Sequence, residues 1–174
     1  MVMRGILLLL RKIRVQKMNL RFLLTKEEGR KYMRPYNALE VAEYIIERCN
    51  QKNKSISNLK LQKILYFVQA QFIVEFGTPC FDNIMQAWDY GPVVPDVYHK
   101  YKVYGNTNIP SYGNKRFNFE QDEQQTLDTT IDSASEYAAS RLVEITHNQS
   151  PWIDAYKKAD ETITPESIRK FFMA

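Results

Sequence analysis

The sequence predicts a mainly α-helical protein: a single compact helical domain with a small β-hairpin or short strands. Three observations lead to this prediction. Apolar residues recur at helical spacing in several segments. Ser150-Pro151 and Thr164-Pro165 each place a capping residue before a Pro, as is common where helices begin. The 174 residues contain no internal repeats or low-complexity linkers. A chain of this length can bury one sizeable core but is short for two domains.

The first two predicted helices span residues 38–50 and about 57–76. The earlier one is amphipathic, with apolar residues at Leu39, Ala42, Ile45, Ile46 and Cys49. The later one begins at Ser57, a favoured N-cap residue, and ends before Gly77, a residue type favoured just after a helix. Apolar residues lie on nearly all its sides, which is typical of a buried helix. We therefore expect residues 57–76 to form the central buried helix.

A short extended segment is predicted next, at residues 84–90, where apolar and polar residues alternate imperfectly. We expect Gly91 and Pro92 to form a turn that ends this segment and leads into a helix at roughly 95–104.

The segment 105–118 is rich in turn residues. We expect a second short strand or hairpin around Phe117 and Phe119. Asn118 would cap the following helix, roughly 119–138, in which apolar residues again recur at helical spacing.

Three further helices complete the predicted fold. One spans about 139–147. The other two begin at Ser150-Pro151 and at Thr164-Pro165, where a capping side chain precedes a Pro at the first helical position.

Positive charge is concentrated in the first fifth of the chain. Residues 1–34 hold ten basic and two acidic residues, whereas the remainder holds 14 basic and 18 acidic residues. This mildly acidic body argues against a dedicated nucleic-acid binder. The apolar run at residues 6–10 is much shorter than the ~20 residues of a membrane helix, and no signal-peptide cleavage site follows it. No membrane association is therefore expected.

Residues 1–32 have three alternative interpretations. They form a basic arm that touches membrane or nucleic acid, an extra helix packed on the domain, or a leader that is absent from the native protein. We favour the leader, because an in-frame ribosome-binding site would encode residues like those at 26–31, just before Met33. Met18 is a second candidate start. The intact mass of the protein made from its native locus would decide between them. The functional domain is expected at residues 33–174.

The sequence contains no Gly-x-Gly-x-x-Gly, no P-loop, no Gly-x-Ser-x-Gly and no His-Glu-x-x-His. Its two cysteines and two histidines, Cys49, Cys80, His99 and His147, are too few for a convincing metal cluster. The lack of a disulfide framework is typical of the reducing cytoplasm. We expect a cytoplasmic protein that is not an enzyme and needs no cofactor or metal.

Three segments together resemble one protein family, the Panacea domain. Residues 57–67 (SNLKLQKILYF) resemble its "kLqKLlYf" helix, and residues 88–98 (WDYGPVVPDVY) resemble its "W-x-y/h-GPV-x-x-x-vY" signature. Thr146-His147 followed by Pro151-Trp152 resembles its C-terminal "tH…PW" element. The segments occur in the family's order. The resemblance covers about residues 36–172 and leaves out residues 1–32.

The resemblance to this SocA-like antitoxin family implies a function. Its members are antitoxins of type II toxin–antitoxin pairs, often in phages and prophages, that neutralise protein toxins by direct contact. One branch instead delivers its toxin to a cytoplasmic AAA+ protease. A cognate protein toxin is therefore the expected partner. The alternatives are a proteolytic adaptor, with residues 171–174 as a candidate disordered apolar tail, or a phage-encoded protein-binding regulator.

Candidate partner-binding residues come mainly from the three motif segments. Lys60 and Lys63 share a helix face, where they bind a toxin carboxylate or form a solvated, salt-bridged stripe. Trp88 and Tyr90 would share a face of an extended segment, as interface anchors or as a structural corner. For the other aromatic residues a core role is the alternative. The predicted set is Lys60, Lys63, Trp88, Tyr90, Gly91, Pro92, Val93, Tyr98, Tyr101, His147 and Trp152.

Overall fold

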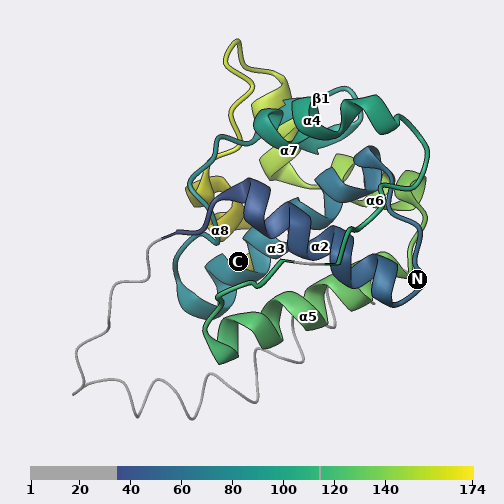
Figure 1. Ribbon diagram of the computed structural model, residues 1–174. Coiled ribbons are helices and arrows are strands. Elements are labelled where there is room, and N and C mark those ends of the chain that lie inside the picture. The colour runs from purple at the N-terminus through teal and green to yellow at the C-terminus, as the bar shows by residue number, and fades with distance from the viewer. Residues whose placement is uncertain (1–34, 114) are drawn as a thin grey trace, which may run out of the picture. The chain divides into compact units, whose positions relative to one another are not determined.

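The computed structural model describes residues 35–113 and 115–174, so the predicted leader, residues 1–32, lies outside the described residues. The described part is mainly α-helical, as predicted (Figure 1). Its helices are α2 (Ala38–Gln51), α3 (Asn58–Phe76), α4 (Pro95–Tyr101), α5 (Gln121–Ser135), α6 (Ala139–His147), α7 (Ser150–Tyr156) and α8 (Pro165–Met173). A 3-10 turn, η1 (Lys102–Tyr104), follows α4, and β1 (Gln86–Trp88) pairs with β2 (Gly91–Val93).

Helix α3 is the central element, as the sequence predicts. Fourteen of its 19 residues are buried, and it contacts α2, α4, α5, α6, α8 and β2. The Ser57 side chain accepts a hydrogen bond from the backbone N–H of Lys60, which satisfies one of the free donors at the helix start. Gly77 ends the helix at a φ of 76°, a conformation that glycine adopts without steric cost.

The hairpin differs from the prediction. Gly91 and Pro92 are not a turn into a helix but belong to β2, which runs antiparallel to β1, and the chain turns at Asp89 and Tyr90 instead. Helical and strand periodicity cannot show this, because each strand has only three residues. The backbone N–H of Ala87 then donates to the Glu161 carbonyl, 2.8 Å away, so the chain before α8 covers the other edge of β1.

The expected second strand around Phe117 and Phe119 is wrong. Both rings pack edge-on against Tyr44 of α2, with centroids 5.0 Å away, and the segment stays irregular. Helix α5 consequently begins at Gln121 with Glu120 at the N-cap, not with Asn118 as its cap.

Two other helix ends also differ from the prediction. Gln149, not Ser150, is the N-cap residue of α7, whereas Thr164 caps α8 as expected. The expected disordered tail at residues 171–174 is wrong as well. Residues 171–173 belong to α8, and the Phe172 ring lies 6.2 Å from that of Tyr66 in α3.

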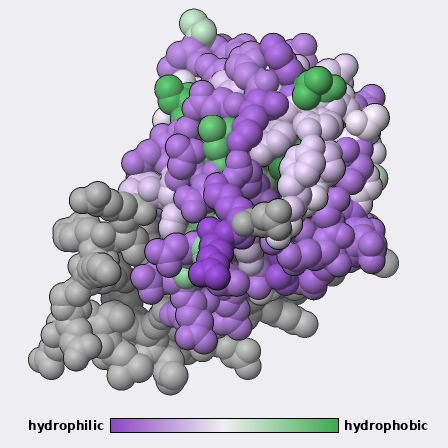
Figure 2. All heavy atoms as spheres, viewed as in Figure 1, coloured by the Kyte–Doolittle hydropathy of each residue, from purple (hydrophilic) through white to green (hydrophobic). Residues whose placement is uncertain are grey.

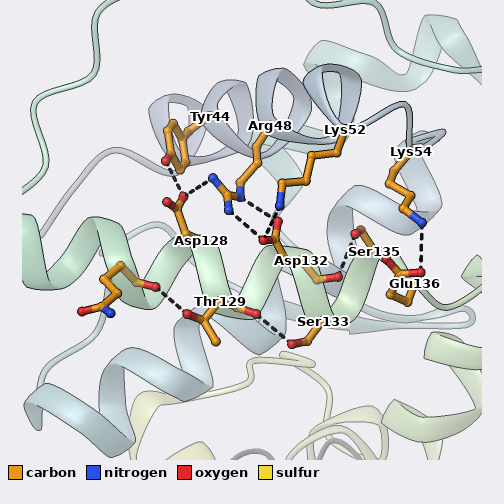
Figure 3. Close-up of polar contacts among 11 residues, drawn as sticks. Tyr44, Arg48, Lys52, Lys54, Asp128, Thr129, Asp132, Ser133, Ser135 and Glu136 are labelled. Carbon is orange, nitrogen blue, oxygen red and sulfur yellow. Dashed lines mark hydrogen bonds and ion pairs between the residues drawn. The ribbon is translucent and has the colours of Figure 1, made fainter.

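A network of charged side chains joins α2 to α5 (Figure 3). Arg48 donates two hydrogen bonds of 2.7 Å to the carboxylate of Asp132 and lies 2.9 Å from Asp128. Lys52 donates to the same Asp132 carboxylate at 2.7 Å, and Tyr44 donates to Asp128. Such a bidentate arginine pair fixes the relative orientation of two helices more strictly than an isolated charge pair does.

None of the described helices is both long enough and apolar enough to cross a membrane.

Asp132→Asn is expected to lower the free energy of unfolding at neutral pH by about 1 kcal/mol, since partly exposed pairs are screened by solvent. Burial alone would raise the pKa of Asp132, but hydrogen bonds from Arg48 and Lys52 outweigh burial and lower it. The stabilisation should therefore be complete above about pH 4, the unfolded value, and be lost as pH falls through the lower folded pKa. Urea unfolding of the wild type and the variant across this pH range tests the prediction. The control is Asp154→Asn, at an exposed position. An equal loss of unfolding free energy in both variants would contradict the prediction.

Candidate functional site

Three parts of the chain that are far apart in sequence meet beside α3. The Lys63 ammonium of α3 donates a hydrogen bond to the Pro92 carbonyl of β2, at 2.8 Å. The Trp152 indole of α7 donates to the Trp88 carbonyl of β1, at 3.0 Å. These contacts bring the three motif segments of the sequence together at one place. We call it the hairpin site and define it by Lys63, Trp88, Gly91, Pro92, Thr146, His147 and Trp152.

Lys63 lies at the base of the hairpin site with a relative exposure of 0%. Among the described residues no carboxylate pairs with it, and burial lowers its pKa to about 7. The expectation of a solvated stripe formed with Lys60 is therefore wrong for Lys63. Its ammonium binds the Pro92 carbonyl of the hairpin. Because Lys63 is fully buried, a carboxylate of a partner protein cannot reach it.

Lys60 lies on the same helix but serves a different segment. Its ammonium donates to the Ser135 carbonyl, at 2.6 Å. Ser135 is the last residue of α5, where carbonyls lack helical partners and a positive charge is favourable. Burial also lowers the pKa of Lys60. This lysine therefore stabilises the end of α5.

Gly91 allows the hairpin to approach α3 and α6 closely. Its φ of +100° is rare for residues with a side chain. A Cβ at this position would lie 2.7 Å from Lys63 Cε and 2.8 Å from Thr146 Oγ1. The next residue, Pro92, has no N–H to leave unpaired, and Lys63 satisfies its carbonyl. The Gly-Pro pair therefore suits a strand that lies against a buried lysine.

A ladder of stacked rings forms the outer part of the site. His147 stacks on Trp152 with ring centroids 4.0 Å apart, and Trp152 stacks on Tyr156 at 4.7 Å. The Tyr156 hydroxyl donates to the Asp89 carboxylate in the hairpin turn, at 2.8 Å. Tyr90, which follows Asp89 in the hairpin turn, is 69% exposed.

The surroundings of His147 favour the neutral form of its imidazole. Burial lowers its pKa, and so does the nearby charge of Lys63, while a hydrogen bond with the Asp89 backbone acts in the opposite direction. Its Nε2 atom is buried without a hydrogen-bond partner among the described residues. The contact that the structure shows for this ring is its stacking on Trp152.

The other predicted site residues divide between core and surface. Val93 and Tyr101 are buried, so they belong to the core. Tyr98 packs edge-on against Trp88, with ring centroids 4.9 Å apart. Sequence reasoning missed Tyr156, although it lies four residues after Trp152 on α7, a spacing that places both rings on one face.

The described residues contain no group of three or more His, Cys, Asp or Glu side chains that could hold a metal ion. Both cysteines are buried free thiols. Burial raises the pKa of Cys49 to about 11 and that of Cys80 well above its usual value. This disfavours the thiolate that nucleophilic catalysis needs. The two thiols are therefore poorly suited to act as nucleophiles.

Comparison with known proteins gives two matches. The family described as "Antitoxin SocA-like, Panacea domain" matches residues 61–153, from α3 to α7. Antitoxin SocA of Caulobacter vibrioides is 29% identical over 128 residues, which cover 67% of this chain and 68% of that protein. No solved structure gives a significant match. The family match includes every residue of the hairpin site.

Gly91→Ala is expected to destabilise the protein by about 2–4 kcal/mol, because steric overlap adds to backbone strain. Gly77→Ala is the matched control: its φ is +76°, but nothing lies within 4 Å of an added Cβ. Gly77→Ala should lower the free energy of unfolding only by the cost of backbone strain, about 1 kcal/mol. Chemical unfolding of both variants measures the difference. Equal losses would show that contact with Lys63 and Thr146 does not restrict this position.

Lys63→Met should change how stability depends on pH. The folded pKa of about 7 lies below that of an unfolded lysine, so the unfolded chain binds this proton more tightly. The free energy of unfolding of the wild type should therefore rise as pH increases from about 7 towards about 10.4, and the variant should lose that rise. Urea unfolding at several pH values tests this, with the exposed Lys170→Met as control. Parallel pH profiles in all three proteins would contradict the prediction.

Proposed function

The chain belongs to the SocA-like antitoxin family with the Panacea domain, and on this premise we propose that it is the antitoxin of a type II toxin–antitoxin pair. It neutralises a cognate protein toxin by binding it directly. The similarity to antitoxin SocA supports the antitoxin role. The observation that carries the proposal is the meeting of the three motif segments in the hairpin site, where the Trp88 and Trp152 rings are half-buried.

The proposed toxin contact is the hairpin face, which we define as Trp88, Tyr90, Trp152 and Tyr156. Tyr90 and Tyr156 are 69% and 41% exposed. Tyrosine and tryptophan are the residue types that most often anchor protein interfaces. The stacking of Trp152 on its neighbours and its bond to Trp88 hold the rings in place before binding. A contact of this kind loses less conformational entropy on binding than one made by mobile side chains.

The proposed role is that of a non-catalytic cytoplasmic binding protein with no cofactor. The adaptor alternative, in which a AAA+ protease is a second partner, receives no support from the C-terminal residues. The expected apolar tail forms part of α8. Direct neutralisation therefore remains the preferred proposal.

A growth assay in a bacterial host tests the proposal. Each reading frame next to the gene is induced alone and then together with the full chain. One neighbour is expected to stop growth, and the full chain to restore it. A parallel arm with residues 33–174 tests whether the first 32 residues are dispensable. The absence of a toxic neighbour, or failure of the full chain to rescue growth, would overturn the antitoxin proposal.

Tyr90→Ala should weaken the affinity for this toxin by about 30-fold, the loss of an interface anchor worth about 2 kcal/mol. Met173→Ala is the control, because Met173 is 38% exposed and belongs to α8, outside the hairpin face. Binding is measured by titration calorimetry after unfolding confirms that both variants fold. An equal loss with Met173→Ala would contradict the assignment of the contact to the hairpin face.

A further inference from the structure

Charge is unevenly distributed within the body of the protein. Residues 97–119 contain four basic residues, Lys100, Lys102, Lys115 and Arg116, and no acidic residue. The rest of the body, residues 35–96 and 120–174, contains ten basic and 18 acidic residues. A second stretch, residues 48–74, holds five basic residues and no acidic residue. Its cations already have partners: Arg48, Lys52 and Lys54 pair with carboxylates, and Lys60 and Lys63 donate to backbone carbonyls.

The fold brings the two ends of the segment 97–119 together. Glu43 of α2 accepts a hydrogen bond from Lys100, at 2.6 Å, and another from Lys115. The Tyr112 side chain lies close enough to Tyr104 to raise the pKa of the Tyr104 hydroxyl. The end of α4, η1 and the loop around Tyr112 thus form one surface. We call it the basic aromatic face and define it by Lys100, Lys102, Val103, Tyr112, Lys115 and Arg116.

This face exposes both apolar and charged groups. Val103 is 82% and Tyr112 is 80% exposed, the highest values among the large hydrophobic residues described. Lys102 and Arg116 are exposed, and within residues 35–113 and 115–174 neither of them forms an ion pair. Figure 2 shows that the side of the molecule facing the viewer is mostly hydrophilic, with small, separate hydrophobic patches. Such a surface suits a polar contact with a few apolar anchors.

The charges favour a protein partner over a nucleic acid. Lys100 and Lys115 already share the Glu43 carboxylate, so two cations, Lys102 and Arg116, are left to attract a partner. Nucleic-acid binding draws its affinity from many phosphate contacts, and a long polyanion would also be repelled by the acidic remainder of the body. A short acidic segment avoids both problems.

We propose that the basic aromatic face binds an acidic segment of a partner protein. Carboxylates of this segment pair with Lys102 and Arg116, and an apolar side chain packs against Val103 and Tyr112. This contact is separate from the hairpin face and does not depend on the proposed toxin contact.

A peptide titration of the full-length protein tests the proposal. The probe is a fluorescein-labelled peptide of alternating Glu and Phe, followed by fluorescence anisotropy at low salt. Lys102→Glu/Arg116→Glu should weaken binding by about 10-fold, because two attractive pairs become repulsive. The matched control is Lys157→Glu/Lys158→Glu, which changes the net charge equally at two exposed residues beside Tyr156. Tyr112→Ala should also weaken binding, whereas Tyr90→Ala should not.

Amide chemical shifts locate the bound peptide and should change within residues 99–116. Three results would each overturn the proposal: equal weakening in the control pair, shifts confined to other residues, or tighter binding of a single-stranded oligonucleotide of the same charge. The peptide is the sole ligand in this experiment. A failure of the antitoxin proposal in the growth assay would therefore leave its outcome unaffected.

Discussion

Burial of α3 on almost every side is the constraint from which the remaining architecture follows. A helix that is apolar all round has to be covered by several elements, and here α2, α5, α6, α8 and β2 provide the cover. The same burial removes Gln62, Lys63 and Gln69 from water. Buried polar groups of this kind are costly unless they form hydrogen bonds. The segments around residues 80–81 and 92–94 lie against α3 because their backbone groups form these hydrogen bonds.

These polar side chains of α3 satisfy backbone groups that have no partner in a helix or sheet. Gln69 accepts from the N–H of Cys80 and donates to the Phe81 carbonyl, both at 2.9 Å. Gln62 accepts from the N–H of Val94, and Lys63 donates to the Pro92 carbonyl. A hairpin with strands of three residues is not stable alone. Its place, and therefore that of the aromatic rings beside it, is fixed by the central helix.

The sequence reveals the helices better than it reveals the site. Apolar periodicity and the caps Ser57 and Gly77 predict α3 almost to the residue, because these signals are local. The burial of Lys63 is not local: it depends on β2 and α6, which come from distant parts of the chain. Lysine is rarely buried, so the sequence favours a solvated position. The hairpin residues became candidates through family resemblance, whereas the role of Tyr156 could have been inferred from its spacing on α7.

Helix α4 contacts both proposed faces. Whether binding at one face changes the affinity of the other therefore depends on whether this helix moves. Tyr98 packs against Trp88 of the hairpin face, and two residues later Lys100 pairs with Glu43 beneath the basic aromatic face. Coupling between the faces would require α4 to have two arrangements of similar energy. The side chains of Asn58 and Gln62 bind the backbone at Tyr98 and Val94, which ties α4 directly to the central helix. A helix held in this way favours one arrangement, so binding at one face should leave the affinity of the other unchanged.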